Sequence, residues 1–502
     1  MPYLPYHEPG ITTILSLASF LLVLNIIRYV LDNLLYCGII GEILIGIIWG
    51  QPVGGTSWLS AGTQEAVQAY GYLGLIGLVF EGGLKTDLAL LRKTVYLSIS
   101  VATVGLLMPL ALSFILLALP FSGRSGTTYP SPLAAFSAGA SLCSTSLGTT
   151  FAILSSAGLQ RTKVGVVLVG AAMMDDVVGL VMVNVVTTLG SGGTGGWPIA
   201  RPIVASFGLF IATLFLAPYM LKPAWNFISA YTANGAEMNV PREIGNLEAT
   251  ARRISRTLPH LGFVLSTAAL AIYVTIAAFI DGSVLFAAFL AGGVVNFLWS
   301  VQCEDIEQHG GAAGMYALYY QAPMDYILVP FFFASIGFSI PLTDMFTGSI
   351  VWKGIVYSLL MIVGKCLVSL VIYLEYAARL WCNRQKPASH EPPDLQPEAN
   401  LQVRSPQAEQ DSSKPPHTIA LLVGLAMTAR GEIGFLIASL SQSSGTLTLQ
   451  ARADSYTHSS REEIFLVIIW AVVICTIVGP IGVGIIVRRV RQHDASSLGG
   501  WN

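Results

Sequence analysis

Long apolar runs separated by short polar stretches dominate this chain. Runs such as residues 11–30 and 163–190 hold about twenty or more mostly apolar residues, which as helices cross the roughly 30 Å hydrocarbon core of a bilayer. A transmembrane β-barrel would show shorter segments of alternating polarity. The pattern therefore predicts an all-α polytopic membrane protein.

The apolar runs predict about 13 transmembrane helices. The second and third are short and rich in glycine, so their limits are the least defined. The expected spans are 11–30, 36–52, 68–83, 95–119, 132–156, 163–190, 200–221, 259–280, 282–301, 325–346, 353–378, 416–442 and 462–487.

The positions of lysine and arginine set the orientation. Of the 26 basic residues, 19 lie in or beside the loops after odd-numbered spans or in the C-terminal tail, and five lie on the other side. Because cytoplasmic loops carry the excess of basic residues, we expect the N-terminus outside and the C-terminus in the cytoplasm. No address signal names the membrane.

Composition narrows the class of protein further. The chain is 54% hydrophobic and 11% charged, whereas a soluble domain carries about 25% charged residues. A net charge of −2 gives no sign of a nucleic-acid partner. The six cysteines lack metal-like or paired spacing, so we interpret them as packing residues.

The predicted domain organisation is a transmembrane domain over residues 1–487 and a short cytoplasmic tail over 488–502. The stretch 382–415 is rich in Pro, Gln and Ser, which is typical of a disordered linker. We expect this linker on the cytoplasmic side.

Polar residues stand near the centres of four expected spans. Charges at that depth cost about 2.5–3.5 kcal/mol each on insertion scales, so they need a partner or a function. The same depth on four helices predicts one polar site. Its members are Ser144, Thr145 and Ser146 in the fifth span, Asp175 and Asp176 in the sixth, Lys365 in the eleventh, and Arg430 and Glu432 in the twelfth.

The adjacent aspartates point about 100° apart on a helix, so they can serve two partners. One division pairs Asp175 with Lys365 and leaves Asp176 facing a cavity. Desolvation disfavours a charged carboxylate and a nearby cation favours it, so such a group can hold either a proton or a monovalent cation. The alternative is that an Asp175–Lys365 pair only fixes helix packing.

Arg430 and Glu432 are two residues apart and do not face each other on one regular helix. We expect them mainly to neutralise helix ends, or each other across a break. Glu42 in the second span is open between a structural and a functional role.

The fifth and twelfth spans are both interrupted midway by small and polar residues. Interrupted helices at matching positions of two halves mark the binding site of many transporters. We therefore predict two inverted six-helix repeats, spans 1–6 and 8–13, with crossed discontinuous helices.

Several segments resemble patterns of the monovalent cation:proton antiporter superfamily, in its branch with an Asp-Asp pair. They are LGLIGLVFEGGLKTDLALLRKT, STSLGTT, MMDDVVGL, LFAAFLAGGVV, PFFFASIGFSI, the lysine in VGKCLVSL, and TARGEIGFLIASL. They occur in family order over about residues 11–487.

The resemblance implies a dimerisation domain, a mobile core domain and a homodimer. It implies that Asp176 carries the transported cation or proton, that Asp175 pairs with Lys365, and that Thr145 and Ser146 line the site. Arg430 and Glu432 would then be supporting charges. The resemblance also implies electrogenic exchange by alternating access. The expected cation is Na⁺, with K⁺ or Li⁺ as alternatives. Neither catalytic residues nor a cofactor is expected.

Two other readings stay open. A passive cation channel could use the same site. An intramembrane aspartyl protease also needs two buried aspartates, but on separate helices that share a proton, and neither a Tyr-Asp nor a Gly-x-Gly-Asp setting occurs in the chain.

Overall fold

The protein is known here from a computed structural model. The side chains of Asp176 and Glu432, although within helices, lie outside the described part of the chain. The described residues are 8, 10–35, 38–50, 58–85, 88–119, 121–123, 126–146, 162–190, 196–221, 223, 246–300, 312–338, 340, 342–385, 417–447 and 458–492.

The described part is helical except for one small hairpin. In the first half of the chain the elements are α1 (Ile11–Leu35), α2 (Gly38–Trp49), α4 (Ala61–Leu84), α5 (Leu88–Ser113), the 3-10 turn η1 (Phe114–Ala118), β1 (Phe121–Gly123), β2 (Gly126–Thr128), α6 (Pro132–Cys143), α8 (Lys163–Gly190), α9 (Gly196–Leu216) and the π turn η2 (Ala217–Leu221).

The second half of the chain contains further helices and one more π turn. Its elements are α11 (Asn246–Phe279), α12 (Val284–Ser300), α13 (Ala312–Tyr319), α14 (Gln321–Pro323), the π turn η3 (Met324–Leu328), α15 (Val329–Phe338), α16 (Leu342–Met345), α17 (Gly348–Cys366), α18 (Ser369–Gln385), α20 (His417–Ala426), α21 (Glu432–Ser443) and α22 (His458–Gln492).

Within the described residues, seven helical segments are long and apolar enough to cross a membrane. Large apolar side chains on several of them face outward, among them Ile11, Tyr96, Phe215 and Leu359. Apolar surfaces of this extent suit a hydrocarbon environment better than water. All thirteen expected spans contain helix, and the fold is that of an all-α membrane protein.

Several boundaries differ from those expected, and three of the differences bear on how the helices pack. The helix α2 has 12 residues, or about 18 Å, because Gly50 and the residues around it end the short apolar run. The tenth expected span, 325–346, is displaced: helical structure runs from Ala312 to Phe338, with polar Gln321 and Asp325 inside it. Residues 382–385, expected in the linker, form the last turn of α18.

The displaced tenth span contains a proline that explains its π turn. Pro323 has no amide proton and its ring crowds the preceding turn, and η3 follows directly after it. A π turn in a helix often marks a functional site or an accommodated irregularity. The remaining part of the expected linker, 386–415, lies outside the described residues.

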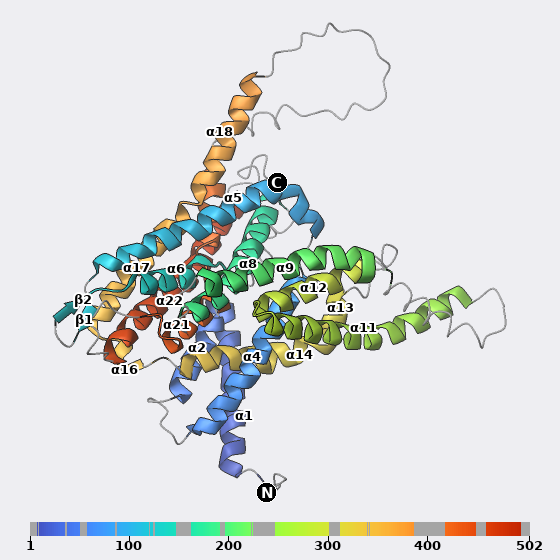
Figure 1. The fold of residues 1–502 in the computed structure, drawn as a ribbon, viewed down its shortest axis with the longest axis horizontal. Coiled ribbons are helices and arrows are strands. Elements are labelled where there is room, and N and C mark those ends of the chain that lie inside the picture. Colours follow the sequence, from blue (N-terminus) through green and yellow to red (C-terminus); the bar gives the residue numbers. More distant parts are fainter. Residues whose placement is uncertain are drawn as a thin grey trace.

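One group of helices packs α1, α2, α4, α11, α12 and α15 together, in the lower and right part of Figure 1. The crossing of α4 and α12 in this group depends on reciprocal glycines. At Gly292 of α12 an added Cβ would meet the Phe80 carbonyl, and at Gly83 of α4 it would meet the Phe289 carbonyl. Small residues allow such close backbone approach between membrane helices.

A second group packs α5, α6, α8, α17, α20 and α21 with α22. The helix α9 contacts both α8 and α12 and so joins the two groups. The small antiparallel hairpin of β1 and β2, which the apolar pattern did not predict, lies at one end of this group and contacts α22.

The turn between α11 and α12 also links the groups. Asp281 there has φ 55°, a left-handed conformation that Asp tolerates better than most residues. Ser283 Oγ donates to the Leu180 carbonyl of α8 over 2.8 Å, and Asn184 Nδ2 of α8 donates to the Gly282 carbonyl over 2.9 Å. The sequence placed Asp281 at a span boundary, and it lies in this turn.

Local sequence explains where the helices beside the breaks begin and end. Ser131 caps α6 by accepting from the Ala134 amide, and Pro132 occupies the first turn, as is typical of helix starts. The helix α21 ends with Gly445 at φ 76° and a hydrogen bond from the Thr446 amide to the Ser441 carbonyl, which is a Schellman motif.

Candidate ion-binding site at two helix breaks

The first break follows α6. The helix ends at Cys143, and Ser144 adopts an extended conformation at φ −67° and ψ 148°. The run Ser144, Thr145 and Ser146 offers the backbone alternative hydrogen bonds, which weakens helix continuation. All three residues are buried. Residues 147–161, the remainder of the expected fifth span and the loop after it, lie outside the described part.

The second break separates α20 from α21. The helix α20 ends at Ala426 and α21 begins at Glu432, with Gly431 extended before it. The Ser146 amide donates to the Ala429 carbonyl over 3.0 Å, so the two breaks touch through their backbones. A Cβ at Gly431 would meet Ser146 Oγ. The glycine is what permits this contact.

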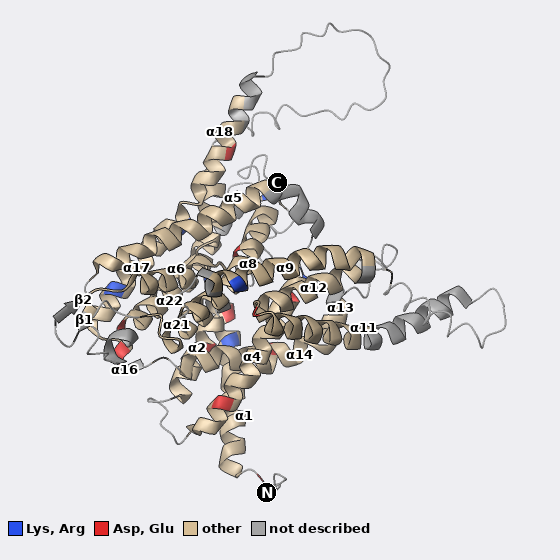
Figure 2. Ribbon diagram, viewed as in Figure 1, with Lys and Arg blue, Asp and Glu red and all other residues tan. Residues whose placement is uncertain are grey.

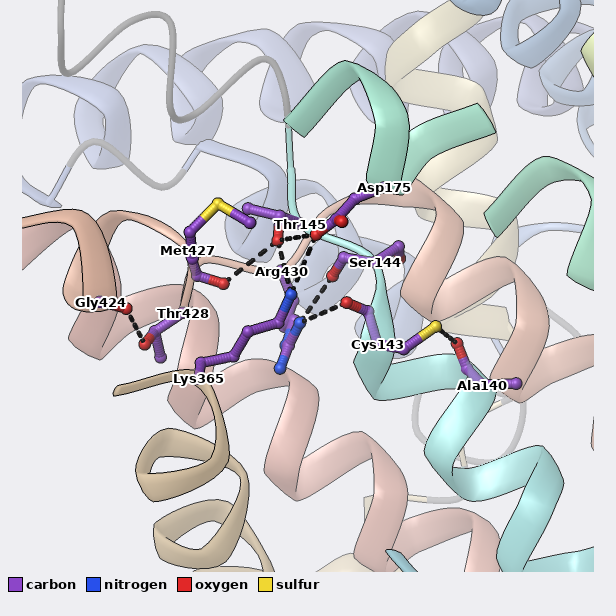
Figure 3. Close-up of polar contacts among 10 residues, drawn as sticks. All are labelled: Ala140, Cys143, Ser144, Thr145, Asp175, Lys365, Gly424, Met427, Thr428 and Arg430. Carbon is purple, nitrogen blue, oxygen red and sulfur yellow. Dashed lines mark hydrogen bonds and ion pairs between the residues drawn. The ribbon is translucent and has the colours of Figure 1, made fainter. Parts of the chain in front are cut away.

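Arg430 connects the second break to the end of α6. Its Nη1 donates to the carbonyl of Ser144 over 2.7 Å and to that of Cys143 over 3.3 Å (Figure 3). Carbonyls at a helix C-terminus lack intrahelical partners and carry partial negative charge. The fully buried guanidinium therefore caps α6 from the other discontinuous helix.

Asp175 and Lys365 meet beside the same junction. Lys365 Nζ, in the last turn of α17, lies 3.1 Å from Asp175 Oδ2 of α8. Both side chains are fully buried. A cation near the C-terminus of a helix is also favoured by the helix dipole. Asp175 Oδ1 has no hydrogen-bond partner among the described residues.

Thr145 bridges this pair, as Figure 3 shows. Its Oγ1 lies 2.8 Å from Lys365 Nζ, which donates to it, and 2.8 Å from Asp175 Oδ2. The Met427 carbonyl is a second acceptor at 3.2 Å. Because a threonine hydroxyl has one proton, it serves either the carboxylate or the carbonyl at a given time.

The structure thus brings together the side chains of Thr145, Asp175, Lys365 and Arg430 and the backbone of Ser146 from four separate segments. Asp176 is the next residue of α8 after Asp175, and Glu432 is the first residue of α21. The side chains of these two residues, predicted as carrier and supporting charge, lie outside the description.

Two neighbours of the site were not found from the sequence. An added Cβ at Gly105 of α5 would lie 3.3 Å from Lys365 Nζ, so the glycine leaves the space in which the ammonium sits. The Met427 carbonyl comes from the second break itself. Gly105 stands in an ordinary apolar run, and a backbone carbonyl carries no residue-type signal.

Glu42, left open by the sequence, belongs to a different cluster. It is fully buried in α2, and Arg28 Nη1 of α1 lies 3.3 Å from its Oε1. The same Nη1 donates to the Asp325 carbonyl of η3 over 2.7 Å, and Asn25 Nδ2 donates to the Tyr326 carbonyl over 2.9 Å. These bonds attach α1 to the π turn.

The junction offers a hard cation three kinds of oxygen: a carboxylate, a hydroxyl and backbone carbonyls freed by the helix breaks. In the described residues no cluster of three or more His, Cys, Asp or Glu side chains could hold a metal ion. A single buried carboxylate next to an ammonium suits weak, exchangeable binding of a proton or monovalent cation more than permanent metal binding.

Comparison with known proteins shows to which family the chain belongs. The sequence pattern of the family described as "Sodium/hydrogen exchanger, transmembrane" matches residues 14–240 and 244–489. The chain belongs to this family. Members of a family of transmembrane exchangers are integral multi-pass membrane proteins, in agreement with the apolar helices of the described part.

Curated relatives of the exchanger family match over shorter stretches. "Probable Na(+)/H(+) antiporter GerT" of Bacillus cereus is 27% identical over 188 residues, 37% of this chain and 46% of that one. "High-affinity Na(+)/H(+) antiporter NhaS3" of Synechocystis is 31% identical over 148 residues, 30% of each chain. This exchanger-family chain thus spans less than half the length of these relatives.

A structural match of the fold extends over most of the chain. The sodium proton antiporter MjNhaP1 of Methanocaldococcus jannaschii has a TM-score of 0.59 with this chain at 15% sequence identity, covering 95% of this chain and 99% of that one. At that identity the likeness shows the fold alone.

Proposed function

We propose that the chain is a secondary active antiporter that exchanges protons for a monovalent cation across a membrane by alternating access. The observation that carries this proposal is the buried Asp175–Lys365–Thr145 cluster at the contact of two helix breaks, in a chain of the sodium/hydrogen exchanger family.

In the proposed mechanism, Asp176 carries the proton or the cation, since a carboxylate at this depth binds only one of them at a time. Lys365 neutralises Asp175 while the site is without cation. Thr145 Oγ1 and the Met427 carbonyl are proposed oxygen ligands, and Arg430 and Glu432 support the helix ends. We also propose electrogenic exchange, in which the Asp175–Lys365 pair binds and releases a second proton besides the one on Asp176.

We propose Na⁺ as the main cation. The support is the names of GerT and NhaS3, which are described as Na⁺/H⁺ antiporters, and an oxygen-only site accepts Na⁺. Another relative, GerN of Bacillus cereus, is described as an "Na(+)/H(+)-K(+) antiporter", so K⁺ is the second candidate.

The test is ion flux in vesicles that contain the purified protein. An imposed Na⁺ gradient should drive proton movement in the wild type, and Asp176→Asn should abolish it, because an amide neither binds a proton at neutral pH nor balances a cation. A pH-sensitive dye inside the vesicles reports the flux.

Asp281→Asn provides the matched control. Asp281 lies in the α11–α12 turn, is 55% exposed and pairs with Arg201, and asparagine tolerates its positive φ, so exchange should persist. Unchanged flux in Asp176→Asn would refute the assignment of the carrier. Current that follows the Na⁺ gradient with no proton movement would favour a passive channel.

A further inference from the structure

A second buried ion pair lies far from Asp175, on the helix that carries Lys365. Lys353 Nζ, near the start of α17, lies 2.8 Å from Glu463 Oε1 of α22. Ser349, one turn earlier in α17, also donates to Glu463 Oε1, over 3.1 Å. The side chains of Lys353 and Glu463 are 5% and 7% exposed, so the pair is almost as well shielded as the one at the helix breaks.

The hairpin covers this pair. Phe121 of β1 is buried, and its ring centre lies 4.5 Å from Lys353 Nζ. An ammonium over an aromatic face is attracted by the ring quadrupole, more so where water is excluded. The Lys353 ammonium is therefore held from two sides, by Glu463 and by the ring.

Further contacts fix α17 along α22 just beyond the pair. An added Cβ at Gly354 would meet Trp470 of α22, so the two helices lie in direct contact there. Trp470 Nε1 donates to the Met345 carbonyl, which precedes α17, over 2.9 Å. These contacts therefore fix the position of α17 along α22, and they lie near the start of α17.

The same α22 holds the second helix break. Thr476 Oγ1 donates to the Arg430 carbonyl over 3.1 Å, and Gly479 packs directly on the backbone of Ala429. One helix therefore carries contacts both to the start of α17 and to the segment against which Lys365 is placed. Lys353 and Lys365 are 12 residues apart on α17, about 18 Å along its axis.

We infer that Lys353 and Glu463 are positioning residues: their pair sets α17 on α22 so that Lys365, at the far end of α17, reaches Asp175 and Thr145. The inference rests on the proposed function, because it assigns the pair a role in exchange. Breaking a buried pair leaves one uncompensated charge, and α17 then adjusts its position.

Lys365 is the group whose behaviour reports this adjustment. Facing it are Asp175 from α8, Arg430 from the second break and the Cys143 thiol at the end of α6, and Gly105 of α5 lies beside its Nζ. A displaced Lys365 alters the protonation of Asp175, and with it the pH dependence of exchange.

The experiment is a double-mutant cycle read as the pH profile of exchange in vesicles. Lys353→Met should shift the pH midpoint by roughly half a unit or more, in the same direction as Lys365→Ala. In the Lys365→Ala background, Lys353→Met should produce no further shift, since no lysine remains to be positioned. Glu463→Gln should behave as Lys353→Met does.

The controls separate positioning from general loss of stability. Lys85→Met removes a lysine from the exposed pair with Glu81 on α4 and should leave the profile unchanged. The exchanged pair Lys353→Glu with Glu463→Lys keeps the ion pair but moves the ammonium away from the Phe121 ring, so it should restore part of the midpoint shift. If Lys353→Met fails to fold, the neutral double variant Lys353→Met with Glu463→Gln replaces it in the cycle.

A midpoint unaltered by Lys353→Met, or shifted equally with and without Lys365, would overturn the inference. Absence of exchange in the wild type would instead overturn the proposed function, and is seen before any variant is compared.

Discussion

At the scale of single residues, Thr145 carries more contacts than its small side chain suggests. Its hydroxyl accepts from Lys365 and lies within hydrogen-bond distance of Asp175 Oδ2 and the Met427 carbonyl. One proton cannot satisfy both acceptors. The acceptor to which the Thr145 hydroxyl donates therefore depends on the charge of Asp175.

Thr145→Val is expected to lower the apparent cation affinity about tenfold or more, because a hydrogen bond to a charged group contributes about 1.5–3 kcal/mol. Thr145→Ser keeps the hydroxyl and should stay within about threefold of the wild type. The measurement is the Na⁺ dependence of proton flux in vesicles. Equal loss in both variants would mean that the methyl group, rather than the hydroxyl, matters.

At the scale of elements, glycines allow the close crossing of α4 and α12. Gly292 and Gly293 are neighbours in α12, but only a Cβ added at Gly292 would meet the backbone of α4, whereas nothing lies within 4 Å of a Cβ at Gly293. The two glycines thus have different surroundings although the sequence does not distinguish them.

Gly292→Ala should lower the melting temperature of the detergent-solubilised protein, since the added methyl group meets the Phe80 carbonyl and helices must separate. Gly293→Ala should leave the melting temperature unchanged or raise it slightly, because alanine is the better helix former by about 1 kcal/mol. Equal melting of both variants would contradict the close crossing of α4 and α12. Scanning fluorimetry is sufficient to compare them.

The sequence predicted the helices and their breaks better than it predicted the long-range contacts between them. Continuous apolar runs predicted α8 and α22, and the small and polar residues around Thr145 and Arg430 predicted the breaks. The Lys353–Glu463 pair was not found, because its members are 110 residues apart and each stands at the edge of an expected span, 353–378 or 462–487. Long-range pairing leaves no periodic signal in the chain.

The displaced tenth span shows a different reason for failure. Gln321 lies just before the expected span and Asp325 is its first residue, so hydropathy excluded the helical residues that precede Asp325. In the structure Arg28 and Asn25 of α1 donate to the carbonyls of Asp325 and Tyr326 in η3. Partners on a distant helix make the polar stretch compatible with helix, and hydropathy does not register them.

At the scale of the whole molecule, polar contacts between the two helix groups include those at the α11–α12 turn. Ser283 and Asn184 join the α11–α12 turn to α8, which also carries Asp175. Two inverted repeats, a homodimer and movement of one group against the other stay predictions. Hydrogen bonds of this kind, which are modest individually, are compatible with relative movement of the groups.

The orientation of the whole chain is testable with fusions. The excess of basic residues on one side predicts that the C-terminus lies in the cytoplasm and the N-terminus outside. A reporter that is active only in the cytoplasm should function when fused after Asn502 and should be silent when fused before Met1. The reverse result would contradict the charge distribution and invert every span.

The contact between the two helix breaks is made by main chain, through the Ser146 amide and the Ala429 carbonyl. Substitutions at Ser146 or Ala429 keep the bonding amide and carbonyl, unless proline replaces Ser146. The backbone bond between the two breaks therefore does not depend on the side-chain groups of Ser146 and Ala429. An engineer who wishes to retune ion preference can vary the hydroxyl-bearing positions next to Asp175 while the scaffold that presents them persists.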